Sequence, residues 1–305
     1  MSAVSRLLSL DCSLIKEDLF KTIDKTRQAY GQAKSRNLVN SSIEEGVLQE
    51  VRKWRRSHPK MGSRTCYYSM KAAGIEISIG VNKFERLLSE KGLTVGQAKR
   101  SGPRTSDGKG KRAYPNLANG LMLNNINQLV VADITYFWVK DRWYYIFTLK
   151  DAYSQKLISL IPSSNMEAIN AVRTLEELCI VRGINNLRNC IHHSDNGSQY
   201  EAEIFKNGIT KLEMKISRAK ECKQNGSSEQ LNHIVKNMYL KHMGINSEGQ
   251  LAKACKKVKE LMNRQRAVKQ LDNLTVNEFE SKIISLPSNL RPKKKLHDFG
   301  DEEGF

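Results

Sequence analysis

Three acidic residues occupy positions where an acid needs an explanation, and together they suggest metal-assisted chemistry on a phosphate. Asp133 interrupts the apolar run LVVADITYF, Asp195 ends the short run NCIHHSD, and Glu229 lies in an amphipathic segment downstream. Carboxylate oxygens are the ligands that hard divalent cations prefer. Two such cations about 3.5–4 Å apart stabilise the entering and leaving oxygens of an in-line phosphoryl displacement. The three acids are therefore a candidate metal site.

Each acid also has a purely structural explanation. Asp195 precedes Asn196 and Gly197, a pair that favours tight turns, so it could simply cap a strand. Asp133 is costly to bury alone, yet an arginine partner or an exposed sheet edge would accommodate it. Glu229 lies near the start of a predicted helix, where the helix dipole favours a negative charge. The sequence around each acid leaves both explanations open.

The elements around the acids are read from the hydrophobic pattern. We expect strands near 129–137, 142–149, 156–161, 189–193 and 212–216, with a hairpin turn at 139–141. We expect helices after a capping box at Ser164 and Glu167, at about 202–207, and at about 228–239. Three adjacent strands followed by alternating strands and helices predict an α/β fold, a mixed sheet with helices on both faces.

The helix that carries Glu229 has two distinct faces. An apolar stripe is formed by Leu231, Ile234, Val235 and Met238. Glu229, His233 and Lys236 follow one another at spacings of four and three, so they line a different face. An acid, an imidazole and an amine in this order suit a metal site that continues into a phosphate-binding surface, although a solvated face would look similar.

The N-terminal part, residues 1–97, reads as helical. Two short helices are expected before residue 40, then helices near 43–58, 62–73 and 80–91, with Gly74 and Gly92 as stop signals. The last two helices and the turn between them have the pattern of a helix-turn-helix. Asn82, Lys83 and Arg86 on the second of these helices are candidate contacts to DNA. Plain packing of two short helices is the alternative.

Charge favours a nucleic-acid partner. The formal net charge is +18 and the sequence pI is about 9.6, and excess charge of this size is usually offset by an anionic partner. Residues 41–113 hold 16 Lys and Arg against seven Asp and Glu. Residues 98–114 are predicted to form a basic linker, and the charged tail at 289–305 is expected to be disordered.

The remaining composition excludes other classes. Six cysteines without a CxxC pair argue against a structural zinc site or a disulfide framework. No stretch approaches the roughly 20 apolar residues of a membrane span, and the N-terminus lacks the apolar run of a signal peptide. A reduced cytosolic protein is expected.

Three segments carry a family resemblance: VVADITYFWVKDRWYYIFTLKDAYS, IHHSDNGSQYEAEIF and SRAKECKQNGSSEQLNHIVK. They are similar to the catalytic core of bacterial insertion-sequence transposases of the IS-three group, which belong to the retroviral-integrase superfamily. The resemblance runs from about 115 to 286, and the helices before it resemble the helix-turn-helix that opens the second reading frame of such elements. It implies an RNase H-like five-stranded core at 115–288.

The resemblance also implies roles for individual residues. Asp133, Asp195 and Glu229 would be the DDE triad, and Lys236 would hold the DNA end near the scissile phosphate. His193 and Asn225 would lie next to the site. His233, which shares a helix face with Glu229, is also expected beside it, and Arg218 and Lys220 in the polar loop SRAKECKQNG are expected to be further DNA contacts. Departures from the family pattern are Val130 in place of a tryptophan, Gln155 in place of an arginine, and a slightly short interval between Asp195 and Glu229.

The reaction implied by the resemblance depends on two Mg²⁺ ions, with Mn²⁺ able to substitute. Water attacks a phosphodiester at the end of the element, and the freed 3′-hydroxyl attacks target DNA. The implied partners are DNA, further copies of the chain, and an upstream-frame helix-turn-helix protein or fusion, in the bacterial cytoplasm on the nucleoid. A non-catalytic DNA-binding remnant or repressor and an RNase H-type nuclease remain as alternatives.

Overall fold

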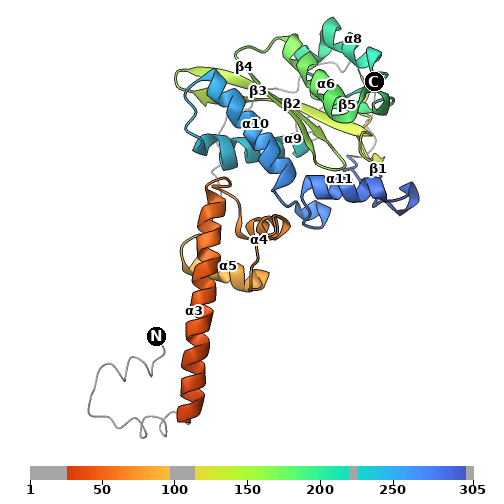
Figure 1. The fold of residues 1–305 in the computed structure, drawn as a ribbon. Coiled ribbons are helices and arrows are strands. Elements are labelled where there is room, and N and C mark those ends of the chain that lie inside the picture. The colour runs from red at the N-terminus through yellow and green to blue at the C-terminus, as the bar shows by residue number, and fades with distance from the viewer. Residues whose placement is uncertain (1–25, 97–113, 220–225, 300–305) are drawn as a thin grey trace.

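Residues 26–96, 114–219 and 226–299 are described by the structure, a computed structural model of the chain (Figure 1). The first of these segments forms a helical N-terminal unit of α3 (Arg27–Arg55), α4 (Ser63–Ala72) and α5 (Val81–Glu90). The other two form an α/β core. Figure 1 shows α3 projecting away from the core, with α4 and α5 beside it.

The helix α3 is longer than the sequence pattern indicated. Two short helices before residue 40 and a third near 43–58 were expected, but residues 27–55 form one helix of 29 residues. The side chain of Thr26 caps it by accepting a hydrogen bond from the Ala29 amide at 3.1 Å. Within the helix only Gly31 and Gly46 weaken it, at about 1 kcal/mol each, and no proline interrupts it. Among the described helices, none is both long and apolar enough to cross a membrane.

The predicted helix-turn-helix elements are confirmed as helices. Gly74 and Gly92, with φ of +77° and +63°, follow the ends of α4 and α5 as expected. The two helices bury their apolar faces against α3 in one small core. Its buried residues include Val47, Leu48 and Val51 of α3, Cys66, Tyr67 and Met70 of α4, and Phe84, Leu87 and Leu88 of α5.

The centre of the core is a mixed five-stranded sheet in the order β4-β3-β2-β5-β6. Its strands are β2 (Leu129–Val139), β3 (Arg142–Asp151), β4 (Leu157–Ser163), β5 (Ile191–Ser194) and β6 (Lys215–Arg218). Strands β2, β3 and β4 are antiparallel, and β5 and β6 run parallel to β2. The predicted hairpin joins β2 to β3, with Lys140 at a φ of +54°. The predicted strands and sheet type are confirmed.

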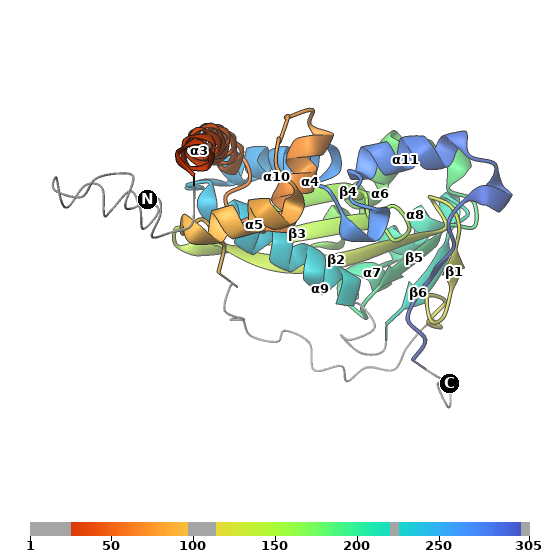
Figure 2. The ribbon, with the colours of Figure 1, turned by 90° about the horizontal axis from the view of Figure 1, so that it is seen from below.

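Helices cover both faces of this sheet (Figures 1 and 2). The helices α6 (Ala168–Arg182) and α8 (Glu203–Lys211) bury one apolar cluster against it. On the opposite face α9 (Gly226–His233), a π-helix η3 (Ile234–Tyr239), the 3₁₀ turn η4 (Leu240–His242) and α10 (Glu248–Arg264) bury another. Shorter elements are α7 (Ser198–Glu201) and the 3₁₀ turns η1 (Ile184–Asn186), η5 (Lys269–Leu271) and η6 (Ser288–Leu290).

Two local expectations were wrong. The capping box at Ser164 does not form: Glu167 is the N-cap of α6 without a side-chain bond, and Asn165 Oδ1 accepts from the Glu167 amide instead. The tail is ordered as far as residue 299, because β7 (Lys294–Lys295) pairs antiparallel with β1 (Met122–Leu123) after α11 (Val276–Ser285). Residues 300–305, like the predicted linker up to 113, lie outside the described residues.

The helical unit docks on the core through buried polar contacts at the end of α3. His58 is 1% exposed and stacks on Trp54, with ring centroids 4.7 Å apart. Its Nδ1 lies 3.0 Å from the Tyr239 hydroxyl, and its Nε2 lies 2.9 Å from Gln265 Oε1. Because buried polar groups without partners are costly, these bonds fix where the unit sits.

Candidate active site

The strand register brings the two aspartates together. Val131 of β2 is paired with His193 of β5 in the parallel ladder. Asp133 and Asp195 each lie two residues further along, so they occupy matching positions where β5 ends at Ser194. Neighbouring strands lie about 4.8 Å apart, and the Asp195 charge contributes to the raised pKa of Asp133.

The helix α9 brings in the third acid. Asn232 of α9 donates from Nδ2 to Asp133 Oδ2 at 2.6 Å, which holds this helix against β2. Glu229 lies three residues before Asn232, one turn earlier on nearly the same helix face. Glu229 is exposed, and its charge also contributes to the raised pKa of Asp133. The structure thus brings the three predicted acids close enough for the charges of Asp195 and Glu229 to raise the pKa of Asp133.

Crowding of these acids changes their protonation. Burial is the largest cause that raises the pKa of Asp133 to about 7, followed by the Asp195 charge. Hydrogen bonds from the Ile134 amide and Asn232 oppose this shift. The pKa of Asp195 is also raised by burial, against the opposing effects of the Gly197 amide bond and the Arg218 charge. Two carboxyls that resist ionisation side by side form a place where a cation would be stabilised.

The described residues contain no ready-made metal cluster of three His, Cys, Asp or Glu side chains. Asp133 Oδ2 is engaged by the Asn232 amide, and Glu229 is exposed to solvent. The donor set nevertheless fits a hard divalent cation, because all three groups offer carboxylate oxygens and their mutual repulsion would be relieved. Coordination would require Glu229 and the Asp133 carboxylate to turn toward a shared ion.

Three other predicted residues lie on or next to the elements that carry the acids. Lys236, on η3, is half-buried, and its pKa is lowered by burial first and then by Lys241, while the Asp133 charge opposes this. His233 is half-buried at the end of α9. His193 is buried on β5, and its Nδ1 lies 2.8 Å from Ser217 Oγ of β6, so that nitrogen is engaged within the sheet.

Arg218, which was expected to contact DNA, is buried inside the core. Its side chain is fully buried, where Nε donates to Glu201 Oε1 at 2.9 Å and Nη2 donates to the Tyr200 carbonyl at 2.7 Å. A guanidinium held in this way cannot reach a phosphate, so the predicted DNA contact by Arg218 is wrong. Its structural role is to anchor α7 beside Asp195. Lys220 and Asn225 lie outside the described residues.

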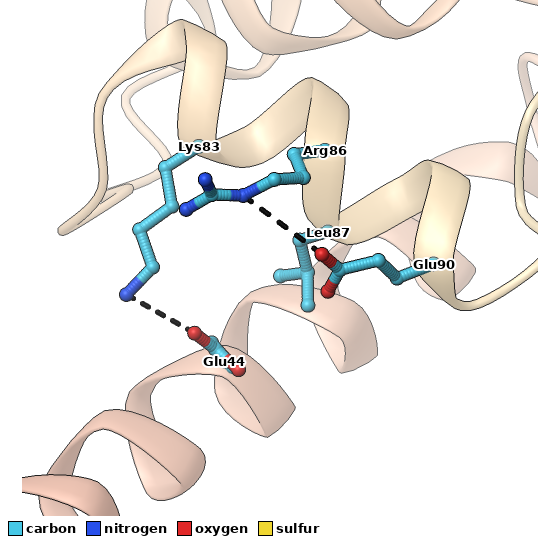
Figure 3. Close-up of a pocket in the computed structure, with 5 residues that line it drawn as sticks. All are labelled: Glu44, Lys83, Arg86, Leu87 and Glu90. Carbon is cyan, nitrogen blue, oxygen red and sulfur yellow. Dashed lines mark ion pairs between the residues drawn. The ribbon is translucent and has the colours of Figure 1, made fainter.

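Two of the candidate DNA contacts on α5 are engaged in ion pairs (Figure 3). Lys83 reaches across to Glu44 of α3, with an ion pair of 3.0 Å, and Arg86 lies 3.8 Å from Glu90. Asn82 Oδ1 accepts a hydrogen bond from Arg64 at 3.2 Å. Asn82 and Arg86 are exposed, so a DNA contact by this helix stays a prediction.

Sequence reasoning missed Asn232, which contacts a candidate acid directly. The signal was present: an amide side chain one helical turn after Glu229 shares its side of the helix. It was hidden because neighbouring residues fit an apolar stripe. The π-helix that follows α9 left no comparable signal in the sequence.

A mixed five-stranded sheet in this strand order, with acids on β2, just after β5 and on α9, has the architecture of an integrase-type catalytic core. Residues 124–223 match the integrase core domain family. The 31 kDa protein of insertion element IS600 from Shigella sonnei is 27% identical over 210 residues, which cover 68% of this chain and 76% of that protein. A protein assigned as a transposase of insertion sequence element IS986/IS6110 from Mycobacterium tuberculosis is 25% identical, covering 59% of this chain and 66% of its own length.

The fold likeness extends to a solved structure. A chain of the simian T-cell lymphotropic virus intasome, solved with the PP2A regulatory subunit B56 gamma, is 16% identical with a TM-score of 0.50. The match covers 75% of this chain and 72% of that one. These similarities place an integrase core domain at residues 124–223 and support an insertion-sequence transposase of the DDE/integrase superfamily.

Proposed function

We propose that Asp133, Asp195 and Glu229 are the catalytic acids with which this DNA transposase cuts the ends of its element and joins them to target DNA. The observation that carries the proposal is the convergence of three acids from β2, β5 and α9, expressed in the raised pKa of Asp133. Among the described residues no arginine pairs with Asp133, whose side chain accepts from the Ile134 amide and Asn232 instead.

The proposed chemistry has two steps. Water attacks the phosphorus at the element end, the bond from phosphorus to the 3′-oxygen breaks, and a free 3′-hydroxyl and a 5′-phosphate result. That 3′-hydroxyl then attacks a target phosphodiester and displaces the target's own 3′-oxygen, so one phosphodiester forms as one breaks. The three carboxylates would hold two Mg²⁺ ions, or Mn²⁺ in their place. Such ions, when bound, stabilise the charge on the entering and leaving oxygens.

The surrounding side chains would orient the reacting groups. The Asn232 amide and the Ile134 backbone amide fix the Asp133 carboxyl, and the Gly197 amide fixes Asp195 Oδ1 at 3.1 Å. Lys236, half-buried and within the field of Asp133, is proposed to hold the phosphate next to the scissile bond. Its flexible stem and compact charge suit a single phosphate oxygen.

The partners proposed for this reaction are DNA ends and target DNA, bound in the bacterial cytoplasm by more than one copy of the chain. The net charge of +18 supports DNA as the partner. The helical unit is proposed to contact DNA through Asn82, Lys83 and Arg86. An upstream-frame helix-turn-helix protein or fusion is proposed to assist in end recognition.

The test is a strand-transfer assay on labelled duplex ends with Mg²⁺, scored for cut and joined products. Asp195→Asn should lose both products while it keeps DNA binding. Asp141→Asn, in the β2–β3 turn, is the matched control and should act like the parent chain. Unchanged transfer by Asp195→Asn would reject the proposed role. Cutting without joining would favour a nuclease, and binding without cutting a repressor or remnant.

A further inference from the structure

Four aromatic side chains on the β2–β3 hairpin form a surface that the acids do not use. Tyr136 pairs across the hairpin with Tyr145, and Trp138 pairs with Trp143. Their ring centroids lie 5.3 Å and 4.9 Å apart, and Tyr136 also meets Trp143 at 6.3 Å. Side chains of directly paired residues point to the same face of a sheet, so these four rings form one aromatic ladder.

The outer half of the aromatic ladder is open to solvent. Trp138 is 49% exposed and Trp143 is 50% exposed, whereas the two tyrosines are half-buried. The Tyr136 hydroxyl reaches Met166 Sδ at 4.0 Å, just before α6 begins, so the cover given by α6 ends near this point. Cross-strand contact between the indoles stabilises the hairpin, but it does not explain why half of each ring system is left to water.

The hairpin turn next to the exposed indoles carries two cations. Lys140 and Arg142 stand at the hairpin turn, both exposed, and neither forms an ion pair with another described residue. Arg142 lies on the opposite face of the hairpin from the aromatic ladder, because it pairs with Val139 and its guanidinium carbon is 5.1 Å from the centroid of the Tyr144 ring. Lys140 is thus the cation next to the rings that has no ring or ion-pair partner among the described residues. Exposed aromatic rings beside an exposed cation are a combination by which proteins hold single-stranded nucleic acid: the cation attracts phosphates and the rings stack on bases.

We propose that the aromatic ladder stacks unpaired bases of the DNA substrate, an inference that rests on the proposed function. In a duplex each base face is covered by its neighbours, so only an unpaired base or a terminal pair can lie on an indole. Trp138 is five residues beyond Asp133 on β2, which is about 17 Å at roughly 3.4 Å per residue. That distance is about five stacked nucleotides, at roughly 3.4 Å each.

The geometry of the sheet favours a single strand over a duplex. Asp133 faces α9, through its bond to Asn232, whereas Tyr145 of the aromatic ladder packs with the cluster on the α6 side. DNA that reaches both must pass around the edge of β2 beyond the end of β5, whose ladder with β2 stops at Val131 and His193. A single strand bends around such an edge far more easily than a stiff duplex does.

Intrinsic fluorescence tests this directly, because the chain has three tryptophans and only Trp54 lies outside the aromatic ladder. Trp54 is half-buried and stacks on His58, so Trp54→Phe leaves the aromatic ladder as the source of indole emission. The full chain with this substitution is titrated with a short oligothymidine and with a blunt duplex of equal length at the same salt concentration. Stronger quenching by the single strand is expected; equal quenching by the duplex would overturn the proposal.

Binding of the same probes to variants gives a second readout. Trp138→Leu and Trp143→Leu should each weaken oligothymidine binding about tenfold, the low end of what one stacked base contributes. Duplex binding should stay nearly unchanged, and circular dichroism and thermal melting identify a variant that has not folded. Trp54→Phe is the control and should bind like the parent chain. Unchanged single-strand affinity in both leucine variants would refute the proposal. It would also be refuted if the two substitutions changed only the self-association of the chain, measured by sedimentation.

Failure of this proposal can be told from failure of the proposed function. Asp195→Asn, made together with Trp54→Phe, should keep the single-strand quenching while it loses cut and joined products. If the parent chain makes no product under any metal but is still quenched, the aromatic ladder binds single strands and the catalytic proposal fails. If the Trp54→Phe chain shows no quenching by the single strand, and Trp138→Leu and Trp143→Leu still form normal cut and joined products, the catalytic proposal stands and the aromatic ladder has another use.

Discussion

Replacing Asp133 by asparagine should stabilise the metal-free protein at neutral pH while it abolishes transfer. Burial and the neighbouring acids raise the pKa of Asp133 from 3.8 to about 7. A carboxyl whose pKa is higher in the folded than in the unfolded chain binds its proton more tightly when folded. The folded state is therefore fully favoured at low pH, and its stability falls as the pH rises from about 4 through 7.

The size of the effect follows from the shift. Each pKa unit corresponds to 1.36 kcal/mol, so a shift of about three units amounts to an upper limit of about 4 kcal/mol near pH 8. Asparagine has no charge to suppress, but it has one acceptor oxygen for the two donors, Ile134 N and Asn232 Nδ2. The lost bond costs about 1 kcal/mol at every pH. The stability difference between Asp133→Asn and the parent chain should therefore shift by about 3 kcal/mol between pH 4.5 and 8.

Urea denaturation in EDTA at several pH values measures this difference. Asp141→Asn, at the exposed hairpin turn, is the control and should follow the parent chain across the range. Adding Mg²⁺ at pH 8 should stabilise the parent chain more than Asp133→Asn, because a cation relieves the repulsion that the amide never had. If the stability difference between the two chains stays constant within about 0.5 kcal/mol from pH 4.5 to 8, the acids do not repel one another and do not form one site.

Two further substitutions test how the core is held together. Arg182→Met should destabilise the chain by about 3–5 kcal/mol in a urea titration, because Arg182 forms ion pairs with Asp151 and Glu280 and all three side chains are at most 6% exposed. Arg188→Met is the control. Arg188 and its partner Glu213 are 74% and 64% exposed, so this variant should change the stability by no more than about 0.5 kcal/mol. Tyr239→Phe leaves His58 Nδ1 without its partner and should cost about 1–3 kcal/mol, seen as faster hydrogen exchange at the end of α3. Tyr68→Phe is its control, and equal exchange in the two variants would argue against the docking contact.

Much of the core was predictable because its strands repeat a simple pattern. Runs such as LVVADITYF and RWYYIFTL alternate or remain apolar over lengths typical of strands, and a turn between them leaves few pairings open. The acids were found because aspartate is disfavoured within a strand, so its presence required an explanation. Their convergence could be anticipated from the order of elements, but the matching positions of Asp133 and Asp195 depend on a register that only the structure supplies.

The failures have physical causes. The continuous α3 was divided in the prediction because its N-terminal half is polar, and a polar helix has no apolar stripe to reveal it. Arg218 was placed on a DNA-facing loop because basic residues are mostly exposed, yet its partners Glu201 and Tyr200 come from a distant segment. Likewise, β7 is ordered through pairing with residues far back in the chain. Long-range partners of this kind leave no local pattern in a sequence.

The helical segment that carries Glu229 is held by hydrogen bonds at two points, and the π-helical turns between them allow both bonds to form. Asn232 holds α9 to Asp133, and seven residues later Tyr239 holds the end of η3 to His58. Residues 234–239 between these points follow a π-helical path, in which each turn takes up one more residue than an α-helix would use. Without that extra residue, the Tyr239 side chain would rotate by about 100° relative to Asn232, and one of the two bonds would be lost. The π-helix thus allows the same segment to contact the acid on β2 and the end of α3 at once, with Lys236 between them.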